Sequence, residues 1–329
     1  MRICVFGAGS VGGYLAGFLA RGGAEVSVVA RGAHLAAIRA NGLTVETPDE
    51  TLTVQIAASD QPADLGHQDI VLVTVKAPAL PGVAAAIAPV LASDTAVAFV
   101  MNGIPWWYFH DHGGALDGRQ LPSLDPGGTL WRTVSPRRAI GAVFWPACSV
   151  PAPGVVRLLT GADAGTVFGE PSGTTTPRLQ ALAAAFRAAG LPVTLTKDIR
   201  ALIWRKLAFN LSAGPLCVLT ETGVMDTHTE PALIRCSAQV LAEAIAVAAA
   251  MGITLDLDIP AIAEMNRSLA HRPSILQDLT AGRPMEIEAL YGVPLEMARM
   301  ASVPTPTLDV LVSLIKVKAR ARGLYHTTS

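Results

Sequence analysis

The chain has 329 residues, a net charge of −1 at pH 7 and a hydrophobic content of 51%. Its length suits two domains rather than one. The sequence has no basic cluster, which excludes nucleic acid as an expected partner because phosphate binding needs stripes of lysine and arginine. No uninterrupted apolar segment reaches the length of a membrane span, so we predict a soluble protein without a membrane partner. The N-terminus is itself a predicted strand rather than an export signal, and this favours a cytoplasmic location.

The first predicted element is an apolar strand that runs directly into a glycine-rich turn and a helix over residues 11–21. The turn has the GxGxxG spacing, in which the glycines permit a tight turn, close approach to a pyrophosphate and close helix packing. The N–H groups at the helix N-terminus bind phosphate. We therefore predict a dinucleotide-binding turn made of Gly7, Ala8, Gly9, Ser10, Val11 and Gly12.

The second predicted strand, residues 25–29, is followed by Ala30 and Arg31 instead of an acidic residue. NAD-binding folds place Asp or Glu here to bind the ribose hydroxyls, whereas an arginine forms charge-assisted hydrogen bonds to a 2′-phosphate. The pattern favours NADP(H) as cofactor, with Arg31 as a ligand of the phosphate. The alternative is that Arg31 is a solvated loop charge.

Short strands and helices then alternate up to about residue 196, which predicts a Rossmann-like, doubly wound parallel sheet. Residues 155–159 and 166–169 suggest a later hairpin. Other predicted strands lie at 70–75, 96–100, 140–145 and 191–195, with helices at 82–91 and 177–190.

The strand pattern ends near Asp198, and the remainder is typical of helices. We therefore predict an α/β protein with an NADP-binding Rossmann-like domain, residues 1–196, and an all-helical domain for substrate binding and dimerisation, residues 197–329. The predicted helices of the second domain are 199–212, 231–251, 260–270, 274–279, 285–300 and 307–321.

A segment rich in glycine, proline and aromatic residues, 105–138, is too long for a simple connection. Loops of this size are often functional. Its aromatic residues could cover a substrate, make a subunit contact, or pack on their own domain, and the sequence leaves these alternatives open.

Two polar residues follow apolar strands, where sites form in open α/β folds. Lys76 follows the strand 70–75, and Asn102 follows the strand 96–100. Either could instead be a turn residue. Lys206 and Asn210 share one face of a predicted helix, and a lysine there can donate a proton to the alkoxide that hydride addition creates. The alternative is a solvated surface lysine.

The sequence suggests no metal site. Four cysteines are scattered without zinc-ligand or disulfide spacing, and we expect them to be reduced. His110, Asp111 and His112 alternate on an extended stretch without further ligands nearby, which is typical of a solvated loop.

Taken in order, these motifs resemble the ketopantoate reductase (2-dehydropantoate 2-reductase) family over most of the chain. The resemblance rests on the glycine turn, Arg31, the strand ending at Lys76, the Asn102-Gly103 pair and four later motifs. Those motifs are Trp204-Arg205-Lys206-Leu207 with Asn210, Ser274-Ile275-Leu276-Gln277-Asp278, Glu286-Ile287-Glu288 and Val303-Pro304-Thr305-Pro306.

The resemblance implies NADPH-dependent reduction of ketopantoate to pantoate, as in pantothenate biosynthesis, in a protein that forms a homodimer. It implies that Lys206 is the general acid and that Glu286 is either its partner or a ligand of a substrate hydroxyl. Asn102 and Asn210 would hold substrate and cofactor, Ser274 would bind the substrate carboxylate, and Lys76 and Arg31 would contact NADP(H).

Position 214 departs from this resemblance. Well-studied members carry a second asparagine one turn after the first, before a proline, but this chain has Gly214-Pro215. Loss of that donor makes reduction of a different branched 2-oxo acid an alternative function. A non-catalytic NADP(H) sensor, acting through the aromatic segment, is a further alternative.

Overall fold

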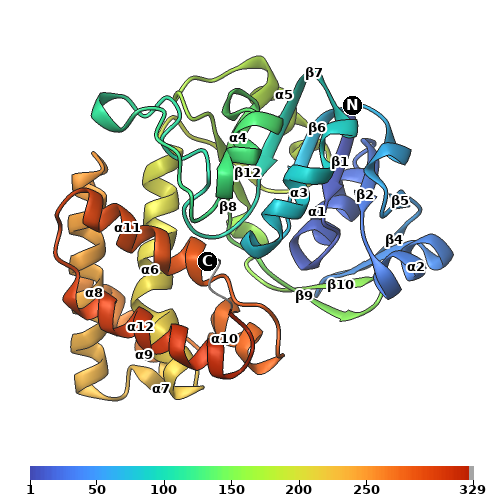
Figure 1. Ribbon diagram of the computed structural model, residues 1–329. Coiled ribbons are helices and arrows are strands. Elements are labelled where there is room, and N and C mark those ends of the chain that lie inside the picture. The colour runs from blue at the N-terminus through green and yellow to red at the C-terminus, as the bar shows by residue number, and fades with distance from the viewer. Residues whose placement is uncertain (326–329) are drawn as a thin grey trace. The chain divides into compact units, whose positions relative to one another are not determined.

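The computed structural model describes residues 1–325, which form two compact units (Figure 1). The first unit contains residues 1–101 and 105–199. The second contains residues 102–104 together with the chain from Arg200 onward. The sequence places a domain boundary near residue 197, whereas the contacts divide the chain after Ile199 and add three earlier residues to the second unit.

The first unit is built on an eight-stranded sheet in the order β12-β11-β8-β7-β6-β1-β2-β5. Its pairs are parallel except for β11 with β8. The strand order reverses beside β1, and ligands bind at such switch points in open α/β sheets. This sheet confirms the predicted Rossmann-like fold. Its strands are β1 (Arg2–Phe6), β2 (Glu25–Val29), β5 (Ala57–Ser59), β6 (Gln68–Val73), β7 (Leu91–Phe99), β8 (Ala139–Phe144), β11 (Thr166–Gly169) and β12 (Val193–Leu195).

The central strands are buried along nearly their whole length, as expected of a parallel sheet covered on both faces. Figure 1 shows β1, β2, β6 and β7 side by side, with α1 and α3 packed beside them. The α-helices of this unit are α1 (Ser10–Arg21), α2 (Gly32–Asn41), α3 (Leu80–Ala86), α4 (Thr129–Thr133) and α5 (Pro177–Ala188).

A second, four-stranded sheet packs on the other side of α1. Its order is β4 (Thr51–Val54), β3 (Leu43–Glu46), β10 (Val155–Thr160) and β9 (Ala147–Ala152). The predicted hairpin of 155–159 with 166–169 is wrong, because β10 pairs with β9 and β3 while β11 pairs with β8 and β12. A Cβ at Gly13 would lie 2.6 Å from Val156 Cγ2, so the glycine lets α1 approach this sheet closely.

The aromatic residues at the start of the 105–138 segment, 106–109, lie in the interior. Trp106 and Tyr108 are 1% and 0% exposed. The Trp106 ring packs edge-on against Phe99 of β7, with 5.5 Å between ring centroids, and also contacts Trp131. Of the alternatives left open by the sequence, packing of the segment on its own unit is the one that these contacts support.

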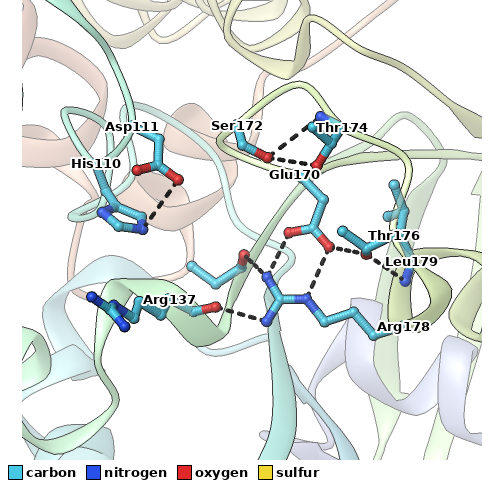
Figure 2. Close-up of polar contacts among 10 residues, drawn as sticks. His110, Asp111, Arg137, Glu170, Ser172, Thr174, Thr176, Arg178 and Leu179 are labelled. Carbon is cyan, nitrogen blue, oxygen red and sulfur yellow. Dashed lines mark hydrogen bonds and ion pairs between the residues drawn. The ribbon is translucent and has the colours of Figure 1, made fainter.

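An ion pair joins Glu170, the residue after β11, to Arg178 of α5 in the same unit (Figure 2). Glu170 is 2% exposed, and its carboxylate accepts hydrogen bonds from Arg178 Nε at 2.9 Å and Nη2 at 2.5 Å. The Thr176 hydroxyl donates to the same carboxylate. Arg178 also donates to the backbone oxygen of Arg137 at 2.7 Å. This network fixes the start of α5 beside the end of β11 and the start of β8.

Every regular element in the described residues of the second unit, 102–104 and 200–325, is a helix, and loops connect these helices. The sequence predicts that its first helix ends at Ser212, but α6 continues through Pro215. Its residues 211–218 are all buried, so tertiary packing compensates for the backbone hydrogen bond that a proline removes. The helices are α6 (Ile199–Thr220), α7 (Val224–Thr227), α8 (Pro231–Ala250), α9 (Ile259–Ser268), α10 (Ser274–Thr280), a π-helical segment (Glu288–Gly292), α11 (Val293–Met300) and α12 (Pro306–Ala321).

Helix α8 is long and apolar enough to cross a membrane by length and composition alone, and within residues 1–325 it is the one helix that meets this test. Its Glu243 is 4% exposed. The Glu243 carboxylate accepts hydrogen bonds from the backbone N–H groups of Thr307 at 3.0 Å and Leu308 at 2.9 Å. These contacts are those of a packed helix inside a folded unit, with a carboxylate at the N-terminus of α12.

Candidate dinucleotide and substrate sites

The glycine turn connects β1 to α1 and is held by the end of the neighbouring strand. Gly7 has φ +112, and a Cβ there would lie 2.6 Å from Val75 Cγ1. The Thr74 hydroxyl donates to the Gly7 backbone oxygen at 2.6 Å. A Cβ at Gly12 would lie 2.1 Å from that same oxygen. Steric contact therefore requires glycine at both positions.

The outer side of the turn is open. A Cβ at Gly9 would meet no atom within 4 Å, and no side chain caps the N-terminus of α1. A pyrophosphate can thus approach the Gly9 backbone and the first N–H groups of the helix. The open space at Gly9 and the uncapped helix N-terminus therefore fit the pyrophosphate of a dinucleotide.

A pocket of about 400 Å³ lies directly beside this turn. It extends from the turn to Arg31 at the end of β2, where the guanidinium is exposed. The tip of the β9–β10 hairpin forms the opposite wall. The lining residues are Ala8, Gly9, Ala30, Arg31, His34, Val150, Pro151, Ala152 and Pro153.

His34 ties three parts of the pocket together. The Gly154 N–H donates to His34 Nδ1 at 3.0 Å, so the ring proton lies on Nε2, which donates to the Ala8 backbone oxygen at 2.7 Å. The imidazole therefore connects α2, the glycine turn and the hairpin tip.

The structure places Arg31 and the glycine turn at one pocket, but Lys76 is not among the residues that line it. Lys76 is exposed and follows Thr74 and Val75, both of which contact the turn. Contact between Lys76 and a cofactor remains a prediction.

In the second unit, Lys206 and Asn210 both lie on α6, one turn apart and half-buried. Burial lowers the pKa of Lys206 to about 8, and the negative charge of Glu286 counteracts part of this effect. Glu286 itself is 4% exposed. The pair therefore combines an ammonium that loses its proton around pH 8 with a carboxylate that favours the charged form of the ammonium.

Asn102 is held beside the segment that carries Glu286. The Ile104 N–H donates to the Ala289 backbone oxygen at 3.1 Å. Gly103 has φ +84, and a Cβ there would lie 2.2 Å from the same oxygen. The glycine after Asn102 thus permits a close backbone contact with the second unit, to which Asn102 belongs.

Ser274 is exposed and begins α10. The next residue, Ile275, approaches α6 at Gly214, where a Cβ would lie 3.5 Å from Ile275 Cγ2. The second unit therefore combines α6, the start of α10 and the segment from Glu286 to Gly292.

Sequence reasoning did not find His34, the hairpin tip, or Tyr291, which lies against Gly214. The Pro-Ala-Pro-Gly run at 151–154 was a usable turn signal. His34 and Tyr291 carried no local signal, because their positions depend on distant backbone.

Within residues 1–325, no group of three or more His, Cys, Asp or Glu residues could hold a metal ion. His110 Nε2 lies 3.5 Å from the carboxylate of Asp111 (Figure 2). The four cysteines are free, and burial raises the pKa of the Cys148 thiol to about 12.

The Rossmann-like sheet and the glycine turn define the class of dinucleotide-binding proteins. The sequence profile described as ketopantoate reductase PanE/ApbA matches residues 3–106, and the profile for the C-terminal part of that family matches residues 198–319. The chain belongs to the ketopantoate reductase family, which confirms the resemblance seen in the sequence.

Relatives cover the whole chain. A 2-dehydropantoate 2-reductase of Mesorhizobium japonicum is 39% identical, over 99% of this chain and 100% of that protein. The crystal structure of a protein from Ralstonia solanacearum MolK2 superposes on this chain with a TM-score of 0.93. The two sequences are 40% identical, and the match covers 98% of this chain and 99% of that one. The PanE/ApbA family ketopantoate reductase from Ralstonia eutropha JMP134 is 28% identical with a TM-score of 0.84, covering 98% and 100%.

Proposed function

We propose that the protein catalyses NADPH-dependent reduction of 2-dehydropantoate (ketopantoate) to pantoate; its relative in Mesorhizobium japonicum is named 2-dehydropantoate 2-reductase. The observation that carries this proposal is the half-buried Lys206 whose pKa is lowered to about 8 beside the buried carboxylate of Glu286. Such perturbed pairs are typical of general acids that work near neutral pH.

The first unit supplies the cofactor site of this proposal. The turn from Gly7 to Gly12 binds the pyrophosphate, and Arg31 pairs with the 2′-phosphate at the edge of the pocket. Lys76 provides a further positive charge beyond β6. The bound nicotinamide supplies the hydride for the keto carbon.

The second unit supplies the acid and the substrate ligands. Lys206 donates a proton to the oxygen that becomes negative during reduction, and Glu286 keeps the ammonium charged until then. The side-chain amides of Asn102 and Asn210 hold substrate and cofactor, and the Ser274 hydroxyl donates to the substrate carboxylate. Each of these groups acts as a hydrogen-bond donor toward an oxygen.

The direct test is NADPH oxidation by the purified protein with a panel of 2-oxo acids, with NADH as the cofactor control. Preference for ketopantoate and NADPH, lost in Lys206→Ala, is the expected result. If the protein reduces only another branched 2-oxo acid, the proposed reaction type stands but ketopantoate is not the substrate. Binding of NADPH without turnover of any acid would favour the sensor function.

We also propose a homodimer formed through α12. Its residues Val310, Leu314 and Val317 are 60%, 48% and 57% exposed and recur at helical spacing, which leaves an apolar stripe on the surface of the chain. Sedimentation should show a dimer at micromolar concentration and a monomer for Leu314→Glu. We place this dimer in the cytoplasm, with small molecules rather than membranes or nucleic acid as partners.

A further inference from the structure

The face of α6 that carries Lys206 and Asn210 continues to Gly214, one turn further along. Gly214 supplies no side chain to this face. The space is nevertheless filled, because the hydroxyl of Tyr291 lies there: a Cβ built on Gly214 would be only 2.3 Å from Tyr291 Oη. The ring carbon Cζ lies further away, at 3.5 Å from the same point. The hydroxyl alone therefore occupies the position of a side chain at 214.

The Tyr291 hydroxyl has no hydrogen-bond partner in the described part of the chain, although the residue is 0% exposed. A buried hydroxyl without a partner lowers the stability of the folded state, so folded proteins contain few such groups, and each one calls for an explanation. Burial raises the pKa of this phenol, and electrostatic interactions with Cys217 and Glu286 act in the same direction. The hydroxyl therefore keeps its proton and is able to donate.

The backbone that positions Tyr291 is also unusual. Tyr291 lies in the π-helical segment Glu288–Gly292, which begins two residues after Glu286. π-Helical turns are rare and occur frequently at functional sites. This segment holds Tyr291 and the Ala289 carbonyl that anchors the Asn102 loop, and the buried Glu286 lies just before it.

We propose that Tyr291 is a substrate-selecting residue, whose hydroxyl replaces a polar side chain at position 214 and donates a hydrogen bond to an oxygen on the distal carbon of a branched 2-oxo acid. The proposal rests on the function proposed above. The chain thereby retains selection for a hydroxylated substrate although Gly214 offers no donor. The enclosed position of the hydroxyl means that the substrate oxygen becomes its partner in a closed environment, where a hydrogen bond discriminates strongly.

The test compares two substrates that differ only in the distal oxygen: ketopantoate and 3,3-dimethyl-2-oxobutanoate, in which a methyl group replaces the hydroxymethyl group. Tyr291→Phe should lower kcat/KM for ketopantoate about 10-fold or more, as expected for one lost hydrogen bond in an enclosed site. The same substitution should leave kcat/KM for the methyl analogue within about 2-fold. Equal losses with both substrates, or no loss with either, would overturn the proposal.

A second test of the proposal introduces a side chain at position 214. Gly214→Asn in the Tyr291→Phe background should recover selection for ketopantoate, because removal of the hydroxyl leaves the nearest ring atom at 3.5 Å from the new Cβ. Gly214→Ala alone should lower the thermal unfolding temperature, and Tyr291→Phe should relieve that loss. An additive effect of these two substitutions would contradict the assigned position of the hydroxyl. A wild-type protein that reduces neither acid would refute the proposed function, whereas the unfolding data report on Tyr291 independently of activity.

Discussion

The pH dependence of the reductase reaction should follow the protonation of Lys206. With a pKa of about 8, the ammonium form makes up about nine-tenths of the molecules at pH 7 and about one-tenth at pH 9. Reduction requires the protonated form, so the turnover rate should be high below pH 8 and fall about 10-fold between pH 7 and pH 9. The sign follows from the role: an acid is lost as pH rises through its pKa.

Glu286→Gln should shift this fall in turnover rate to lower pH. The Glu286 charge raises the pKa of Lys206, and removal of an opposite charge at close range lowers such a pKa by about one unit or more. At pH 8 the protonated fraction would then fall about 5-fold.

The measurement is kcat for NADPH oxidation at saturating substrate from pH 6 to pH 9.5, for the wild type, Glu286→Gln and the exposed control Lys197→Ala. The control should reproduce the wild-type profile. A wild-type kcat that does not change with pH would refute the assignment of Lys206 as the titrating acid. So would a Glu286→Gln variant whose kcat falls at the same pH as that of the wild type.

Three further predictions concern other polar side chains. Glu170→Gln should lower the free energy of unfolding by about 2–3 kcal/mol in urea, because the Arg178 fork loses its charged partner at a 2% exposed site; an effect under about 0.5 kcal/mol would contradict this. His34→Ala should weaken NADPH binding about 5- to 10-fold in a titration, whereas His34→Gln, which can donate and accept in the same places, should bind nearly as the wild type. Burial lowers the pKa of His228, whose Nε2 accepts from an asparagine amide, so stability should be full above the unfolded pKa of about 6.5 and decrease as pH falls below it; His228→Gln should reduce that acid sensitivity.

The sequence was sufficient for the features that local patterns encode. The turn from Gly7 to Gly12, the run of helices after Ile199 and the Rossmann-like class follow from residue spacing within short windows. The extension of α6 through Pro215 did not follow, because a proline ends a helix by local rules and only the buried surroundings of residues 211–218 reveal why it continues.

Long-range pairing explains the other differences. Strand β10 pairs in parallel with β3, more than a hundred residues earlier, and no local signal specifies such a partner. The sequence therefore could not predict that the β9–β10 hairpin forms a pocket wall beside Arg31, although it contains a turn signal at residues 151–154. Likewise, a glycine at position 214 indicates a missing side chain, but only the fold shows that the hydroxyl of Tyr291 fills the space.

The three residues Asn102–Ile104 have a consequence for dissecting the protein into parts. They belong by their contacts to the helical unit but lie a hundred residues before the rest of it, and Ile104 is fully buried. A fragment that begins at Arg200 would leave the Ala289 carbonyl without its Ile104 amide and would expose the backbone surface that Gly103 covers. The helical unit therefore cannot be exchanged between relatives as one continuous segment. The short loop after β7 has to be exchanged together with it.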